Sequence, residues 1–117
     1  MQEPASSIAL VSNVYIRGMF FEKAGDCHAG HSHCYDHITL LAKGSLRVRV
    51  NGKSTEFKAP HSIFIKADLE HELTAIEDDT IAYCVHALRD KDSGEILDPS
   101  MIPAGVDPMS MAEKLCN

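Results

Sequence analysis

Residues 25–44 read GDCHAGHSHCYDHITLLAKG and hold four of the seven histidines in the chain. Three of them, His31, His33 and His37, are separated from one another by even numbers of positions. In a β-strand the side chains alternate between two faces, so these three imidazoles would point to the same side. Imidazole is the commonest protein ligand of transition metals near neutral pH. The pattern predicts a metal site; the alternative is a His-rich loop or surface cluster without a ligand.

Length and charge restrict the classes of function. A chain of 117 residues forms one domain with a core of its own. Its formal net charge of −6 argues against a nucleic acid or an anionic membrane as partner. The first seven residues have no basic region, and the apolar run after them is too short for a signal sequence or a membrane span. The four cysteines have no recognised disulfide spacing, so we expect reduced thiols and a cytoplasmic protein.

Short segments rich in β-branched and aromatic residues recur between Gly, Pro, Asn and Asp, which indicates an all-β sandwich or barrel. In the segment 45–50, apolar side chains alternate with arginines, as in a strand with one buried face. The following Asn51-Gly52 predicts a tight hairpin turn. The expected strands are 8–12, 14–22, 35–42, 45–51, 54–58, 62–66, 72–77 and 80–89.

The chain divides into three parts. Residues 13–89 are expected to form the barrel, and residues 1–12 an N-terminal arm or edge strand. The apolar run 8–11 could pair with a second copy along this edge, which predicts a homodimer. Residues 90–117 are expected to be irregular, with a short helix that begins at Asp107-Pro108 and ends near Leu115.

The spacing around the histidines resembles the first motif of the cupin superfamily. Gly25 is followed after five residues by His31, after one more by His33, after three more by His37, and after six more by Gly44. His37 stands where most members carry glutamate. Every spacing of the motif is matched.

Residues 60–71 resemble the second cupin motif, with His71 at the position of its last metal ligand. This match is weaker, because Pro60 replaces a glycine, residues 66–68 replace Pro-x-Gly, and Ala75 stands where asparagine is common. The resemblance covers about residues 13–89. It implies an antiparallel jelly-roll β-barrel with a metal ion inside the barrel mouth.

The implied ligands are His31, His33, His37 and His71. The even spacing of His31, His33 and His37 supports the first three as ligands. Only the resemblance adds His71 to the ligand set. Four neutral imidazoles would leave a divalent ion with its full +2 charge, more than in relatives with a carboxylate ligand. Imidazole suits Fe, Ni, Cu or Zn better than Mg or Ca. The resemblance to small cupins with four histidines adds Mn, and the spacing does not choose among the five.

The resemblance implies a metal-dependent dioxygenase acting on a small oxygen-bearing molecule. Candidate bases for its proton transfer are Tyr83, His86 or a metal-bound hydroxide. The alternatives are a metal-dependent isomerase or lyase, a non-catalytic metal- or ligand-binding module, and a structural metal site. His28 has the opposite parity to His31 and is expected at the rim or in solvent. His61 is expected at the surface.

Overall fold

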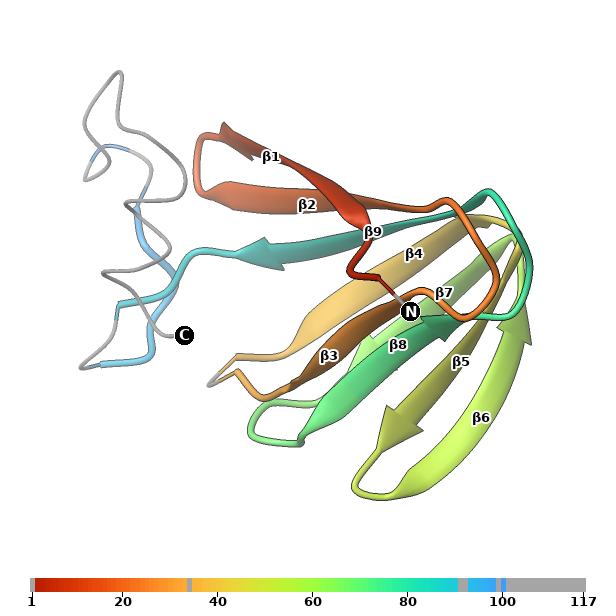
Figure 1. The fold of residues 1–117 in the computed structure, drawn as a ribbon. Coiled ribbons are helices and arrows are strands. Elements are labelled where there is room, and N and C mark those ends of the chain that lie inside the picture. Colours follow the sequence, from red (N-terminus) through yellow and green to blue (C-terminus); the bar gives the residue numbers. More distant parts are fainter. Residues whose placement is uncertain (1, 34, 91–92, 99, 101–117) are drawn as a thin grey trace.

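The computed structural model describes residues 2–33, 35–90, 93–98 and 100, except for the side chain of His31. Within this part of the chain, nine antiparallel strands form two sheets, shown in Figure 1. The strands are β1 (Ala5–Val11), β2 (Val14–Phe21), β3 (Cys27–His31), β4 (His37–Lys43), β5 (Ser45–Val50), β6 (Lys53–Lys58), β7 (His61–Ile65), β8 (His71–Ala75) and β9 (Thr80–Ala87).

The two sheets face each other. The five-stranded sheet has the order β1-β2-β9-β4-β7, and the four-stranded sheet has the order β3-β8-β5-β6. They lie close together at one end and diverge at the other, which we call the wide end (Figure 1). This arrangement confirms the expected all-β, jelly-roll fold.

The core lies between the sheets because strands such as β5 and β7 alternate inward apolar residues with outward ones. Leu46 and Leu73 are completely buried, and complete burial of such a side chain contributes about 1.5–3 kcal/mol. The buried cluster consists of Met19, Phe21, Leu41, Leu46, Val48, Ile63, Ile65, Leu73, Ala75 and Ala82.

The predicted hairpin is confirmed. Asn51 and Gly52 both have positive φ values, of 48° and 80°, as the tight turn requires. The turn sets the register of β5 and β6, in which Val50 pairs with Lys53. Val50 and Val48 thereby face the core, while Arg49 is exposed.

One strand was not predicted. β3 has the sequence CHAGH, in which alanine and glycine have low β propensity and no apolar alternation appears. It forms because it pairs with β8 at the edge of the four-stranded sheet. As a result, the expectation that His31, His33 and His37 share one strand is wrong: β3 ends at His31, and β4 begins at His37.

The N-terminal strand β1 lies at the edge of the five-stranded sheet and pairs with β2. At the other end, Arg89 forms an isolated bridge with Ile96, and Leu97 packs with Tyr15 and Leu88 in a small second core. The helix expected from Asp107 lies outside the described residues. Among the described residues, no helix has the length and apolar character needed to cross a membrane.

Candidate metal centre

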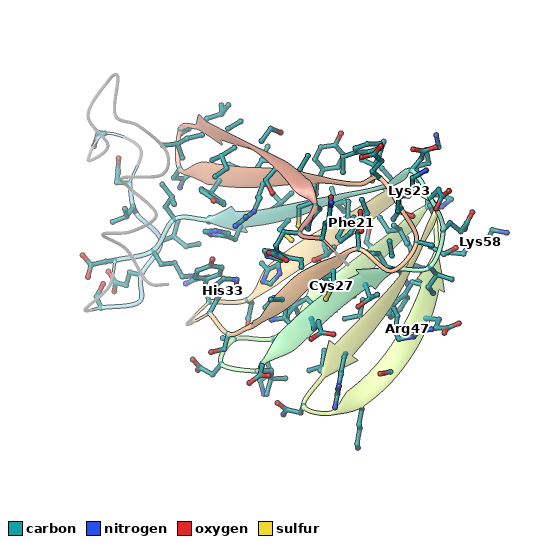
Figure 2. The ribbon with its side chains drawn as sticks, in the orientation of Figure 1. Phe21, Lys23, Cys27, His33, Arg47 and Lys58 are labelled. Atoms are coloured by element: carbon teal, nitrogen blue, oxygen red, sulfur yellow. The ribbon has the colours of Figure 1, made fainter. Side chains whose placement is uncertain are left out.

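The histidines of the first motif and His71 meet at the wide end, although they come from different elements. His31 ends β3, His33 lies in the loop 32–36, His37 begins β4 and His71 begins β8. The backbones of His31 and His71 are register partners. Figure 2 shows His33 at this end of the molecule, beside the loop that joins β3 to β4.

Three of the imidazole rings lie close to one another. The ring centroids are 5.5 Å apart for His33 and His37, 5.4 Å for His33 and His71, and 5.1 Å for His37 and His71. Imidazoles that share one ion at metal–nitrogen distances of about 2.1 Å have centroids about 4.6–5.6 Å apart. His37 and His71 are buried, so their rings are sheltered from bulk water.

As these side chains are placed, no group of three or more His, Cys, Asp or Glu residues in the described part of the chain forms a metal site. The three rings have the right separation, but their nitrogen atoms would have to turn to a common point for one ion to be bound. The chemistry of His71 fits this role. Its Nδ1 donates a hydrogen bond to the carbonyl oxygen of Leu69 at 3.2 Å, so in the neutral ring Nε2 carries the lone pair that a metal requires.

Two hydrogen bonds tie the loop that carries His33 to the loop before β8. The backbone N–H of Ala67 donates to Asp36 Oδ1 at 2.7 Å, and the N–H of Asp68 donates to the carbonyl oxygen of His33 at 2.6 Å. Asp68 can turn the chain there because it has a positive φ of 63°. These contacts explain why residues far apart in sequence hold His33 and His71 on the same side of the barrel.

Tyr35 lies between two imidazoles. Its ring stacks on His33 at 4.7 Å and on His86 at 3.9 Å, and Tyr15 continues the column at 4.8 Å from His86. Burial raises the pKa of the Tyr35 hydroxyl well above its usual range. It therefore stays protonated and can act only as a neutral hydrogen-bonding group near neutral pH.

The two predicted catalytic residues lie on opposite faces of β9. His86 has the same parity as buried Ala82 and faces the interior. Burial lowers its pKa, and its Nδ1 donates to the carbonyl oxygen of Ala87 at 3.1 Å. Tyr83 has the opposite parity, is 40% exposed and lies over Gly18 on the outer face. Its position gives no support to a role at the histidine cluster.

The parity argument for His28 is wrong. A bulge between His28 and His31 shifts the register, so that His28 pairs with core residue Leu73 and His31 pairs with His71. His28 is buried rather than solvated, with Nδ1 3.1 Å from a carboxylate oxygen of Glu3. The second oxygen of Glu3 accepts the N–H of Ala29. No sequence pattern indicated the bulge or this contact. His61, by contrast, is exposed as expected.

A pocket of 480 Å³ lies between the β5–β6 hairpin and β7. Val50 and Ile65 line it, and their register partners are His71 and His37. Register partners in an antiparallel pair share one face, so Val50 and Ile65 separate the pocket from His71 and His37, neither of which lines it. Its lining is mainly apolar: Val48, Val50, Phe57, Ile63, Phe64 and Ile65, with Asn51, Lys53 and Thr55.

Arg17 occupies an inward position on the other side, between buried Tyr15 and Met19 of β2. Its Nε is buried and has no hydrogen-bond partner, and Nη2 donates only to Ser6 Oγ, at 3.4 Å. Among the described residues, no carboxylate lies within ion-pair distance of this guanidinium. Its positive charge acts on the pKa of Tyr35, which places it near the aromatic column.

The fold is that of solved cupin structures. A cupin-2 domain protein from Shewanella frigidimarina matches with a TM-score of 0.60 at 15% identity, covering 74% of this chain and 83% of its own. An RmlC-like cupin with a double-stranded β-helix fold from Methanocaldococcus jannaschii gives 0.62 at 12% identity, with coverages of 72% and 81%. KdgF from Halomonas sp. gives 0.61 at 18% identity, with coverages of 68% and 74%.

No protein-family model matches the sequence, and no curated protein sequence matches it. The structural likenesses extend over more than two thirds of each chain at low sequence identity, so they concern the fold. Together with the two facing sheets, they show that this chain has the double-stranded β-helix fold of the solved cupin structures.

Proposed function

We propose that the chain binds one divalent transition-metal ion (Fe, Mn, Ni, Cu or Zn) through His31, His33, His37 and His71. In this proposal it acts as a metal-dependent oxidoreductase of the dioxygenase type on a small oxygen-bearing molecule. The observation that carries the proposal is the approach of the His33, His37 and His71 rings to within 5.1–5.5 Å of one another at the wide end of the barrel.

The bound ion would polarise substrate oxygen atoms as a Lewis acid. The chain would supply a base. His86 faces the same interior, and because its Nδ1 donates to Ala87, the Nε2 atom of its neutral ring carries a lone pair. Stacking between Tyr35 and Tyr15 fixes the plane of this ring. We therefore assign His86, rather than Tyr83, to proton abstraction.

The surroundings of the histidines support a substrate with one apolar end and one anionic end. The 480 Å³ pocket, whose lining residues Val50 and Ile65 pair with His71 and His37, has the volume and apolar lining of a small-molecule site. On the other side, the half-buried Arg17 has no carboxylate partner among the described residues. A cation in such a position is stabilised by an anionic ligand, and a guanidinium suits a carboxylate best. We infer that the substrate carries an apolar group and a carboxylate.

The register gives the approximate size of this substrate. On the inner face, Arg17 pairs with Cys84, which pairs with Thr39, two residues from His37. Two strand spacings and one two-residue step separate the Arg17 and His37 backbones by about 12 Å. A separation of this size between the two backbones fits a small ligand.

Metal analysis tests the ion, and oxygen uptake tests the chemistry. We expect about one equivalent of metal in protein purified from metal-replete medium, a loss of that metal in His71→Ala, and full retention in His61→Ala, which removes an exposed histidine outside the cluster. Wild type without stoichiometric metal would refute the site. Metal without oxygen uptake across a panel of small hydroxy and keto acids would refute the oxidoreductase and leave the isomerase, lyase or binding-module alternatives.

A further inference from the structure

Residues 2–4 connect the two sheets at one side of the barrel. β1 is an edge strand of the five-stranded sheet, and β3 is an edge strand of the four-stranded sheet. The N–H of Cys27 in β3 donates to the carbonyl oxygen of Gln2 at 2.8 Å, and the N–H of Gln2 donates to Asp26 Oδ1 at 3.2 Å. Figure 1 shows the chain passing from here to β1 in the other sheet. The N-terminal segment is therefore attached to both sheets.

The side chain of Glu3 extends this contact along β3. One carboxylate oxygen accepts the N–H of Ala29 at 2.9 Å, and the other lies 3.1 Å from Nδ1 of His28. Since an ionised carboxylate can only accept, Nδ1 carries the hydrogen in that contact. Cys27 and Ala29 are two residues apart, so their N–H groups point to the same edge of the strand. Gln2 and Glu3 thus occupy the edge of β3 that faces away from β8.

Pro4 explains why Glu3 lies along the strand. A proline restricts the residue before it to extended conformations, so the backbone of Glu3 is already close to the geometry that an edge contact requires. Pro4 itself is buried, which anchors the segment where it crosses toward β1. Little conformational entropy therefore remains to be lost when Glu3 meets β3.

The position of β3 depends strongly on hydrogen bonds at its edges. Of its described side chains, Cys27 and His28 are buried, whereas Ala29 is small and exposed. Packing of apolar side chains therefore contributes less to this strand than to the central ones. β3 ends at His31, one of the four proposed metal ligands. A shift of the strand would move the backbone of His31 with it.

We propose that Glu3 is a positioning residue for the metal centre. In this proposal residues 2–4 act as a clasp that holds β3, and thereby His31, in the place that metal binding requires. Hydrogen bonds to a carboxylate are shorter and stronger than those between neutral groups, so Glu3 is the main contact of the clasp. A metal site tolerates displacements of its ligands of only about 0.5 Å. The effect on the metal rests on the proposed function, whereas the clasp belongs to the metal-free protein.

Hydrogen exchange of metal-free protein tests the clasp. Glu3→Ala removes the carboxylate, and the amides of Cys27 and Ala29 should exchange at least about tenfold faster than in wild type. Glu3→Gln keeps an oxygen that accepts the Ala29 N–H and should retain most of the protection. The matched control is Glu56→Ala, at the other edge of the same sheet. It removes an ion pair with Arg47 of the same length, 3.1 Å, and of similar side-chain exposure, 61% against 57% for Glu3. It should leave the exchange of β3 unchanged.

Titration with Co²⁺ tests the effect on His31. We expect Glu3→Ala to weaken Co²⁺ binding about tenfold and Glu3→Gln and Glu56→Ala to change it less than about threefold. His31→Ala leaves three histidines and a weaker, measurable site. In that background Glu3→Ala should cause no further loss, because the ligand that it positions is absent. Circular dichroism verifies folding, and Glu3→Asp, which is one methylene shorter, replaces Glu3→Ala if the latter does not fold.

Three outcomes would overturn the proposal, and they are distinguishable. Unchanged exchange of β3 in Glu3→Ala would remove the clasp. An equal loss of Co²⁺ affinity from Glu3→Ala with and without His31 would show a general loosening of the fold instead of the positioning of one ligand. A wild type that binds no Co²⁺ would refute the proposed metal site and the effect of Glu3 on it together.

Discussion

Gly44→Ala should destabilise the fold by about 2–5 kcal/mol. Gly44 joins β4 to β5 with a φ of +85°, and an alanine in this left-handed region costs about 1–2 kcal/mol. The added Cβ would also overlap Thr80 Oγ1 and lie 2.9 Å from Thr80 Cβ. Thr80 cannot move aside easily, because it is completely buried and its hydroxyl donates to the Glu77 carbonyl oxygen. Such overpacking costs about 1–3 kcal/mol in addition.

Gly52→Ala separates the two causes. Gly52 has a similar φ of +80°, but an added Cβ would meet nothing within 4 Å, so only the backbone cost of about 1–2 kcal/mol applies. Urea unfolding of both variants, followed by circular dichroism, measures the difference. In Gly44→Ala/Thr80→Ala, part of the loss should be recovered, since the hydroxyl oxygen is gone. Equal destabilisation by Gly44→Ala and Gly52→Ala would refute the packing argument.

Three further variants test the core, the titration of the interior and the inferred anion site. Leu73→Ala should cost about 3–4 kcal/mol in the same urea assay, because Leu73 is completely buried; a loss below 1 kcal/mol would contradict the described core. Burial lowers the pKa of His86 below 6.5, so the unfolded chain takes up its proton first and the free energy of unfolding should fall as the pH drops below 6.5. His86→Phe should flatten this dependence, and an unchanged slope would exclude His86 as its source. Arg17→Met should weaken the binding of succinate, measured by calorimetry, at least tenfold, whereas Arg49→Met should not; equal affinities would remove Arg17 from the site.

The strands that the sequence predicted are those with a local signal. The segment 45–50 alternates in hydrophobicity, and Asn51-Gly52 supplies the turn, so both were placed correctly. β3 has no such signal, because its stability comes from pairing with β8, 40 or more residues away in the chain. Sequence alternation cannot reveal a strand that is determined by its partner.

The argument that brought the histidines together was partly wrong, and the metal site itself stays a prediction. Parity within one strand suggested that His33 and His37 converge, and their rings are indeed 5.5 Å apart, but a loop rather than a strand connects His31 to His37. The rule that alternate residues face the same side of a sheet holds only where no extra residue interrupts the strand pairing. It failed for His28 because β3 contains a bulge. No sequence pattern indicated that Arg17 could bind an anionic ligand, because its lack of a nearby carboxylate among the described residues is visible only in the folded protein.

The charges at the wide end give the histidine at position 37 a physical interpretation. With a carboxylate there, a bound divalent ion would already be partly neutralised, and an anionic substrate would gain less by binding. In the proposed site, neutral imidazoles would bring no negative charge to the ion, and the inward guanidinium of Arg17 adds a positive one to the same interior. Electrostatic attraction increases as water is excluded, so this interior should favour ligands that bring negative charge with them. Under the proposed function, the imidazole at position 37 and the inward Arg17 therefore favour the same class of substrate, a small acid.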